Sequence, residues 1–166
     1  MERELTEVYC GNGRGKTTLA IGQCLKASVQ GKSVIIIQFL KGKERRELDF
    51  LGELEGLDIK IFRFEKMDSC YSELTDQEKA EEKTNILNAL NFARKVIATQ
   101  ECDVLLLDEI LGLLDNGIAD EEAIADILKI KDESMHIILT GDCLPQGLKK
   151  YVDSATMLTT ELLQEE

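Results

Sequence analysis

One stretch of eight residues, from Gly11 to Thr18, constrains the fold of this chain more than any other part of its sequence. It reads Gly-Asn-Gly-Arg-Gly-Lys-Thr-Thr and lies between a short apolar run and a helical pattern. Three glycines in five positions let the backbone turn tightly and point its N–H groups toward an anion. The helix expected to begin here adds the positive end of its dipole, Lys16 adds a charge, and the Thr17 hydroxyl is suited to holding a magnesium ion. The stretch therefore predicts a phosphate-binding loop.

The loop is one residue shorter than the usual phosphate-binding pattern, which is glycine, four residues and then Gly-Lys-Ser/Thr. Here only Asn12, Gly13 and Arg14 separate Gly11 from Gly15. The shortening changes the path that a chain of phosphates takes around the loop. A solvated glycine turn at the start of a helix is the alternative interpretation. The order of strand, loop and helix disfavours it, because the phosphate-binding motif requires that order.

The run from Val104 to Glu109, Val-Leu-Leu-Leu-Asp-Glu, is the second informative stretch. An apolar strand that delivers two carboxylates at its carboxyl end is the usual second half of a phosphate-loop site, where an acid holds magnesium directly or through water. Acidic residues after a strand are also common in turns. With the upstream loop present, however, Asp108 and Glu109 join Thr17 as the candidate magnesium ligands.

Short apolar runs alternate with helical patterns along the chain. The expected strands are 5–10, 33–40, 59–64, 104–107 and 136–141, with an edge strand at 156–160, and the expected helices are 16–30, a long helix after Thr75, and 120–131. The long helix begins with a capping box, Thr75 to Glu78, and the carboxylates of Glu78, Glu81 and Glu82 are interpreted as surface charge. The alternation predicts an α/β fold with a mostly parallel sheet. We expect residues 1–166 to form a single nucleotide-binding domain.

The charge balance limits the kinds of partner. The chain carries 32 acidic and 20 basic side chains, a formal charge of −12. Such a surface repels a nucleic-acid backbone, whose binding requires Lys and Arg to neutralise phosphates. No apolar run approaches the ~20 residues that a membrane span needs, and no signal-peptide pattern precedes the first strand. We therefore expect a cytoplasmic protein that binds neither nucleic acid nor membranes.

Cysteine and histidine usage gives no sign of zinc or redox chemistry. The five cysteines are widely spaced and form no Cys-x-x-Cys pair, which favours reduced structural thiols. The single histidine, His136, begins a predicted strand and has no partner histidine or cysteine near it in the sequence. A structural role for His136 is therefore favoured over a catalytic one.

These motifs together resemble the ATP:corrinoid adenosyltransferases of the vitamin B12 pathway. The shortened loop, from Val8 to Thr18 with Ala20 and Gly22 after it, is the mark of that family. The similarity continues in family order and spacing through Gln38-Phe39-Leu40-Lys41-Gly42, Leu107-Asp108-Glu109-Ile110 with Gly117, and Ile137-Ile138-Leu139-Thr140-Gly141. It covers nearly the whole chain, from about Val8 to about Asp153. The resemblance implies a three-layer α/β fold of the P-loop NTPase (RecA-like) type with a mostly parallel central sheet.

The resemblance also implies an activity and roles for the site residues. Members of this family transfer the 5′-deoxyadenosyl group of ATP to the cobalt of a reduced corrinoid and release the whole triphosphate. Lys16 would be the catalytic residue that neutralises the leaving triphosphate, Thr17, or Thr18 beside it, would meet the phosphate or the metal, and Asp108 and Glu109 would organise magnesium and its waters. The implied nucleotide-binding residues are Gly11, Asn12, Gly13, Arg14, Gly15, Lys16, Thr17 and Thr18.

The same resemblance sets the expected substrates and partners. They are ATP with Mg²⁺, a reduced corrinoid, a second copy of the chain in a homodimer, and a reducing flavoprotein as a possible partner. In this family ATP lies in the opposite sense to that in ordinary phosphate-loop enzymes, so that its ribose C5′ rather than its terminal phosphate is open to attack. The shortened loop fits that inversion.

The chain departs from the family at three points. Relatives place aromatic residues, including a Trp, in the loop before the long helix, where they press on the corrinoid. This chain has no Trp, and only Tyr71 is a candidate corrinoid contact. Relatives follow Thr-Gly with Arg, whereas this chain has Asp142, an anion that weakens ATP binding if it faces the phosphates without compensation from magnesium or Arg14. The usual C-terminal segment is shortened or altered and ends soon after Thr160.

The sequence leaves three functions open. An active corrinoid adenosyltransferase comes first, because cobalt(I) is itself a strong nucleophile and needs no activating base, which explains the missing catalytic histidine. A phosphate-loop ATPase or small-molecule kinase would release orthophosphate or ADP instead, and the short loop disfavours it. A non-catalytic nucleotide or corrinoid sensor of the same fold is motivated by Asp142 and the absent Trp.

Overall fold

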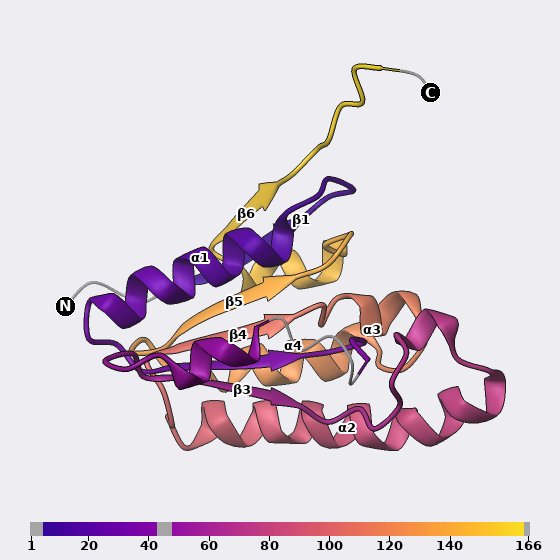
Figure 1. Ribbon diagram of the computed structural model, residues 1–166, viewed down its shortest axis with the longest axis horizontal. Helices are drawn as coiled ribbons and strands as arrows, with labels where there is room; N and C mark the ends of the chain where they lie inside the picture. The colour runs from indigo at the N-terminus through magenta and orange to yellow at the C-terminus, as the bar shows by residue number, and fades with distance from the viewer. Residues whose placement is uncertain (1–4, 43–47, 165–166) are drawn as a thin grey trace.

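The six strands of the described residues lie in one sheet, in the order β3-β2-β4-β5-β1-β6. The computed structural model describes residues 5–42 and 48–164. Each strand pairs with its neighbours in parallel register, as Figure 1 shows. The strands are β1 Thr6–Cys10, β2 Val34–Gln38, β3 Ile59–Arg63, β4 Val104–Asp108, β5 His136–Thr140 and β6 Ser154–Met157. The mostly parallel sheet expected from the sequence is thereby confirmed.

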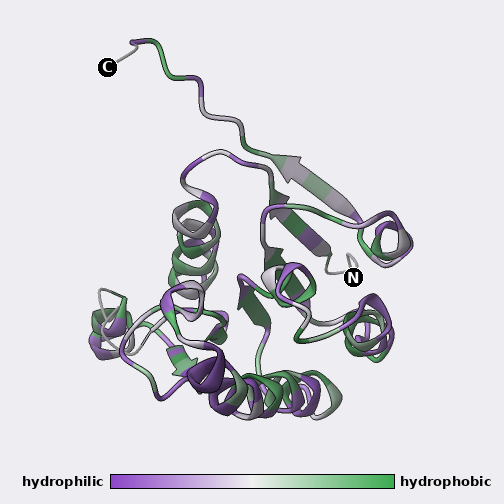
Figure 2. Ribbon diagram, turned by 90° about the vertical axis from the view of Figure 1, so that its right-hand side faces the viewer, coloured by the Kyte–Doolittle hydropathy of each residue, from purple (hydrophilic) through white to green (hydrophobic). Residues whose placement is uncertain are grey.

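Helices connect the strands and lie on both sides of the sheet (Figure 2). The α-helices are α1 Lys16–Val29, α2 Asp76–Ala98, α3 Gly112–Asp115 and α4 Glu121–Lys129. Three short 3-10 helices complete the described part of the chain, η1 Asp49–Glu53, η2 Tyr71–Glu73 and η3 Gln146–Tyr151. In the ranges 5–42 and 48–164, none of the helices combines the length and the apolar character needed to cross a bilayer. The architecture is a three-layer α/β fold.

The two faces of the sheet pack against different helices. Ile35 and Ile37 of β2 belong to a core cluster that includes the buried residues of α2 and α4. Val34 and Ile36 belong to the opposite cluster, with Ile21 of α1. Because side chains alternate between the two faces of a strand, a strand covered on both faces must be apolar at every position. This explains the continuous apolar run in β2.

Glu82 on α2 corrects one expectation from the sequence. It was interpreted as surface charge, but it is only 1% exposed. Its carboxylate accepts the N–H groups of Lys66 at 3.0 Å and of Met67 at 3.3 Å. The loop between β3 and α2 folds over the first turns of the helix, and its backbone donors need an acceptor there. Glu78, by contrast, closes the expected capping box with Thr75.

The last strand begins two residues earlier than expected. β6 covers Ser154–Met157 rather than 156–160 and forms the edge of the sheet beside β1. After β6 the chain stays beside the end of β1, where the Leu158 N–H donates to the Cys10 carbonyl oxygen at 2.8 Å. His136 lies at the other end of these strands, with its Nε2 2.6 Å from the Glu7 carboxylate. That position fits the structural role expected for His136.

Candidate functional site

The phosphate loop connects β1 to α1 at the carboxyl edge of the sheet. Gly11 and Gly15 have positive φ angles of 104° and 96°, a conformation that strongly favours glycine. Gly15 is the N-cap residue of α1. An anion seated in the loop would therefore meet the N-terminal end of this helix, which favours negative charge.

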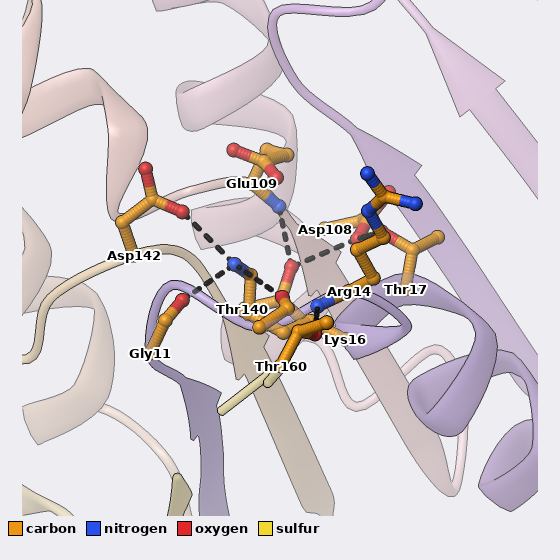
Figure 3. A network of polar contacts seen from close by, with 10 residues as sticks. Gly11, Arg14, Lys16, Thr17, Asp108, Glu109, Thr140, Asp142 and Thr160 are labelled. Carbon is orange, nitrogen blue, oxygen red and sulfur yellow. Dashed lines mark hydrogen bonds and ion pairs between the residues drawn. The ribbon is translucent and has the colours of Figure 1, made fainter. Parts of the chain in front are cut away.

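The Lys16 side chain folds back over the loop (Figure 3). Its Nζ donates to the carbonyl oxygens of Gly11 at 2.6 Å and Gly13 at 3.3 Å, and it pairs with Oδ1 of Asp142 at 2.9 Å. The Lys16 side chain is 11% exposed and that of Asp142 72% exposed. The loop therefore holds its cation largely buried, with Asp142 as a solvent-exposed counter-ion.

Two threonine hydroxyls join the loop to the carboxyl ends of β4 and β5. The hydroxyls of Thr17 and Thr140 both donate to Oδ1 of Asp108 at 2.8 Å. The N–H of Glu109 in turn donates to the Thr140 hydroxyl at 2.7 Å. Asp108 and Thr140 are fully buried. Thr17, rather than its exposed neighbour Thr18, reaches the carboxylate that the sequence indicates as a metal ligand.

The second oxygen of Asp108 is held from the neighbouring strand. Gln38 Nε2 donates to Asp108 Oδ2 at 3.2 Å, and Gln38 Oε1 accepts from Nε of Arg63 at 2.7 Å. Arg63 also pairs with Asp49 at 2.9 Å. The three side chains share a row across β4, β2 and β3, since Gln38 is in register with both Asp108 and Arg63. Outer hydrogen bonds of this kind fix the orientation of a metal-binding carboxylate.

The donors at this edge suit a magnesium ion shared with a nucleotide. Mg²⁺ prefers oxygen ligands, takes one or two carboxylates from the protein and keeps water and substrate phosphates in its shell. Thr17, Asp108 and Glu109 supply such oxygens beside the phosphate loop. Within residues 5–42 and 48–164 no group of three or more His, Cys, Asp or Glu side chains could hold a metal.

Glu109 directly follows Asp108, and its side chain is partly exposed. Its φ of 65° is unusual for a residue with a side chain, and such strain often occurs at functional sites. Burial raises the pKa of Glu109, the charge of Asp108 raises it further, and Lys41 and Lys16 lower it.

A cleft of about 320 Å³ opens beside the phosphate loop. The residues that line it include Leu40, Lys41, Tyr71, Glu109 and Asp142. Tyr71, the candidate corrinoid contact, reaches the cleft, although it is only 9% exposed and packs mainly in the core. Because Asp142 also pairs with Lys16, the cleft and the loop meet at this residue.

Glu65 supports one wall of the cleft. Its Oε1 accepts the N–H of Leu40 at 2.8 Å, and Leu40 has a strained φ of 64°. Glu65 is 7% exposed. Burial raises its pKa to about 6, with backbone N–H groups acting against the rise and the charge of Glu82 adding to it. The carboxyl group that accepts the N–H of Leu40, in the wall of the cleft, therefore has a pKa of about 6.

Glu65→Gln is expected to change the pH dependence of stability. Because the folded pKa of Glu65 is raised, its favourable contribution is fully present below about pH 4.5 and is lost as the pH rises through about 6, a change of about 2 kcal/mol. Gln keeps an acceptor for Leu40 but cannot ionise. The unfolding free energy of the variant relative to wild type, measured in urea, should therefore rise by about 2 kcal/mol between pH 4.5 and 7.5. Glu55→Gln, at an exposed position, is the matched control. An equal difference at both pH values would contradict this reading of Glu65.

The structure brings most of the predicted site residues together. Lys16 contacts Gly11, Gly13 and Asp142. A second set of hydrogen bonds joins Thr17 and Thr140 to Asp108, and Glu109 to Thr140. The two sets meet where Lys16 precedes Thr17 in the chain. Asn12, Arg14 and Thr18 are exposed, and the Arg14 N–H donates to the Thr160 hydroxyl at 2.8 Å.

Sequence reasoning missed the roles of Thr140 and Gln38. Both are polar residues at the carboxyl ends of otherwise apolar strands, and both are almost fully buried. That pattern is a signal in itself, because a buried polar group needs a hydrogen-bond partner. The partner, Asp108, follows only from the order in which the strands pair, which the sequence does not give.

The fold and the site define a class of protein. The first strand of the parallel sheet leads through a glycine-rich loop with Lys16 and Thr17 into a helix, and the Thr17 hydroxyl contacts the buried Asp108 at the end of β4. This is the arrangement of a phosphate-loop nucleotide-binding protein. Among solved structures, a KaiC-like protein from Pyrococcus horikoshii OT3 matches with a TM-score of 0.58 over 98% of this chain and 76% of that chain. At 16% identity this likeness shows the fold alone.

Sequence comparison identifies the family. The model of the ATP:corrinoid adenosyltransferase family BtuR/CobO/CobP matches residues 2–162, and the chain belongs to this family. The corrinoid adenosyltransferase of Escherichia coli K12 and the corrinoid adenosyltransferase CobA of Salmonella typhimurium LT2 are each 26% identical over 157 residues, which cover 95% of this chain and 77% of the relative. A corrinoid adenosyltransferase of Pseudomonas aeruginosa is 25% identical over 164 residues, with 95% and 76% covered. The resemblance seen in the sequence is confirmed, and the enzyme class is that of a corrinoid adenosyltransferase.

Proposed function

We propose that this protein transfers the 5′-deoxyadenosyl group of ATP to the cobalt(I) of a reduced corrinoid and releases triphosphate. The observation that carries the proposal is the junction of loop and cleft, because Asp142 both pairs with Lys16 and lines the cleft. A nucleotide with its phosphates in the loop can therefore present its sugar to a substrate in the cleft. The short loop supports a phosphate path different from that of ordinary phosphate-loop enzymes.

The chemistry asks little of the protein beyond position and charge. The electron pair of cobalt(I) forms the Co–C5′ bond while the bond from C5′ to oxygen breaks, and its electron pair leaves with the triphosphate, so that cobalt is oxidised to cobalt(III). Holding the two reactants in line accounts for much of the acceleration. Negative charge grows on the departing oxygen, and Lys16, held in the loop, supplies fixed positive charge there.

A magnesium ion, when bound, supplies further positive charge for the triphosphate. We propose that the Thr17 hydroxyl and the Asp108 carboxylate hold it and that Glu109 orients its waters. Thr140 and Gln38 donate to the two oxygens of Asp108 and fix its direction. The Thr17 hydroxyl already lies within hydrogen-bond distance of the Asp108 carboxylate. The two groups therefore need little rearrangement to bind one ion together.

We also propose the finer assignments that the family resemblance implies. Residues 1–166 would act as a single domain in the cytoplasm and assemble as a homodimer. A flavoprotein is a possible source of the electrons that reduce cobalt, and neither nucleic acid nor membrane takes part. Tyr71 would contact the corrinoid, which its place in the cleft lining supports.

A spectroscopic assay tests the proposal. Chemically reduced cobalamin under anaerobic conditions, mixed with the protein, ATP and Mg²⁺, should acquire the absorption spectrum of an alkylcobalt corrinoid. The same mixture with AMP in place of ATP is the control, since it lacks the triphosphate leaving group. An unchanged cobalamin spectrum, with ATP binding demonstrated separately, would overturn the proposal.

A nucleotide or corrinoid sensor of the same fold is the second candidate function. The ion pair between Lys16 and Asp142 favours it, because the pair must open before Lys16 can reach a phosphate group. A sensor would bind ATP without turning it over.

Asp142→Asn is expected to strengthen ATP binding about fivefold at low salt. The substitution frees Lys16 and removes an anion from the edge of the loop, and an ion pair with one exposed partner is worth up to about 1 kcal/mol. Calorimetry with ATP and Mg²⁺ measures the effect. The gain should shrink at high ionic strength, because salt screens exposed charges. Equal affinities of variant and wild type at low salt would show that Asp142 does not oppose the nucleotide.

A further inference from the structure

The segment Leu158–Thr160, which follows β6, lies against the phosphate loop through its backbone and one hydroxyl. The Leu158 N–H donates to the Cys10 carbonyl oxygen at 2.8 Å, and the Gly13 N–H donates to the Leu158 carbonyl oxygen at 2.9 Å. The Arg14 N–H donates to the Thr160 hydroxyl at 2.8 Å. In Figure 1 the yellow segment passes the indigo loop between β1 and α1 before it leaves the body of the protein, and Figure 3 shows Thr160 beside Arg14.

The glycines of the loop make this contact possible. A Cβ atom on Gly11 would lie 2.4 Å from the Leu158 carbonyl oxygen, and a Cβ on Gly13 would lie 2.6 Å from the same atom. Both distances are far inside van der Waals contact with backbone that has no flexible end to move. By contrast, a Cβ on Gly15 would meet nothing within 4 Å. Two of the three loop glycines are therefore also needed for the approach of the C-terminal segment.

Peptide geometry connects Thr160 to Lys16. The carbonyl oxygen of Gly13 accepts from Lys16 Nζ, and the peptide between Gly13 and Arg14 is trans, since the described residues contain no cis peptide bond. In a trans peptide the N–H points opposite to the C=O. The Arg14 N–H therefore points away from Lys16, directly toward the Thr160 hydroxyl. The peptide between Gly13 and Arg14 thus accepts a hydrogen bond from Lys16 through its C=O and donates one to Thr160 through its N–H.

We infer that Leu158–Thr160 is a working part of the nucleotide site and that Thr160 is a positioning residue, which fixes the peptide between Gly13 and Arg14 and, through it, Lys16 for the triphosphate. The inference rests on the proposed nucleotide site but not on adenosyl transfer. Sequence reasoning placed these residues in an edge strand at 156–160 and assigned them no part in binding, because a hydroxyl acceptor just after an edge strand has no signature of its own.

Thr160→Val tests the inference, because valine has nearly the shape of threonine and lacks the hydroxyl acceptor. We expect calorimetry with ATP and Mg²⁺ to show affinity about fivefold weaker than wild type, the effect of one lost hydrogen bond. Thr160→Ser, which keeps the hydroxyl, should restore the affinity. Thr156→Val, at an exposed position of β6 outside this segment, should leave it unchanged. Hydrogen exchange at the Arg14 amide should be faster in Thr160→Val than in wild type.

Kinetics separate positioning from general stability. Thr160→Val should raise KM for ATP and lower kcat, because Lys16 acts on the leaving triphosphate. The melting temperature should be nearly unchanged, because Thr160 is exposed. ATP affinity equal to wild type would overturn the inference, and tighter binding would show that the segment instead competes with phosphates for the loop. Wild-type protein that binds ATP but makes no alkylcobalt product would overturn the proposed function and leave this inference standing.

Discussion

Lys16→Ala is expected to lower the rate of alkylcobalt formation about 1,000-fold at saturating ATP. Its Nζ lies inside the phosphate loop, 2.6 Å from the Gly11 carbonyl oxygen, where the triphosphate of the proposed reaction would gain negative charge as it leaves. Removing one preorganised donor from such a position costs about 100- to 1,000-fold in rate, and a full positive charge places Lys16 at the upper end. The anaerobic spectroscopic assay measures the effect directly.

Lys26→Ala is the matched control for this prediction. Lys26 lies exposed in the last turn of the same helix, α1, so the control removes the same charge at a distance from the loop. It should retain the wild-type rate, and both variants should melt at nearly the wild-type temperature. A Lys16→Ala variant that keeps more than about a tenth of the rate would place the main stabilisation of the leaving group elsewhere.

Asp108→Asn is expected to lower the rate about 100-fold and to move the Mg²⁺ dependence to higher concentrations. Oδ1 of Asp108 accepts from Thr17 and Thr140, while Oδ2 accepts from Gln38. An amide of the same shape has one oxygen and one NH₂ group, so in either orientation a donor faces a donor. The substitution also removes the carboxylate charge from the proposed metal, and changes around a metal ligand typically cost 10- to 100-fold.

A magnesium titration of the reaction rate distinguishes this role from a purely structural one. Asp115→Asn, at an exposed position on α3, should titrate like wild type. If Asp108→Asn loses stability but retains the wild-type dependence on Mg²⁺, then Asp108 supports the sheet edge and does not bind the metal. A variant with the wild-type rate and the wild-type titration would contradict both roles.

Much of the fold could be predicted because its signals are local. The glycine loop, the apolar run of β2 and the capping box at Thr75 each depend on residues adjacent in sequence. The candidate site was predictable to the same extent. Lys16, Thr17 and Asp108 were identified by their place in motifs, and they lie at one edge of the sheet because the carboxyl ends of parallel strands meet there.

The remaining features could not be predicted because they depend on contacts between distant segments. Glu82 looks like an ordinary acid in the first turns of a helix until the loop after β3 folds over it. Thr140 contacts Asp108 only because β5 lies beside β4. Asp142 was recognised as a departure from the family, but its pairing with Lys16 required the structure.

A structure of the protein with ATP and Mg²⁺ tests the central claim most directly. We expect the triphosphate to occupy the loop around Lys16 and the ribose C5′ to face the cleft lined by Tyr71 and Glu109. A γ-phosphate that faces this cleft, with the ribose directed away from it, would contradict adenosyl transfer and indicate phosphoryl transfer instead.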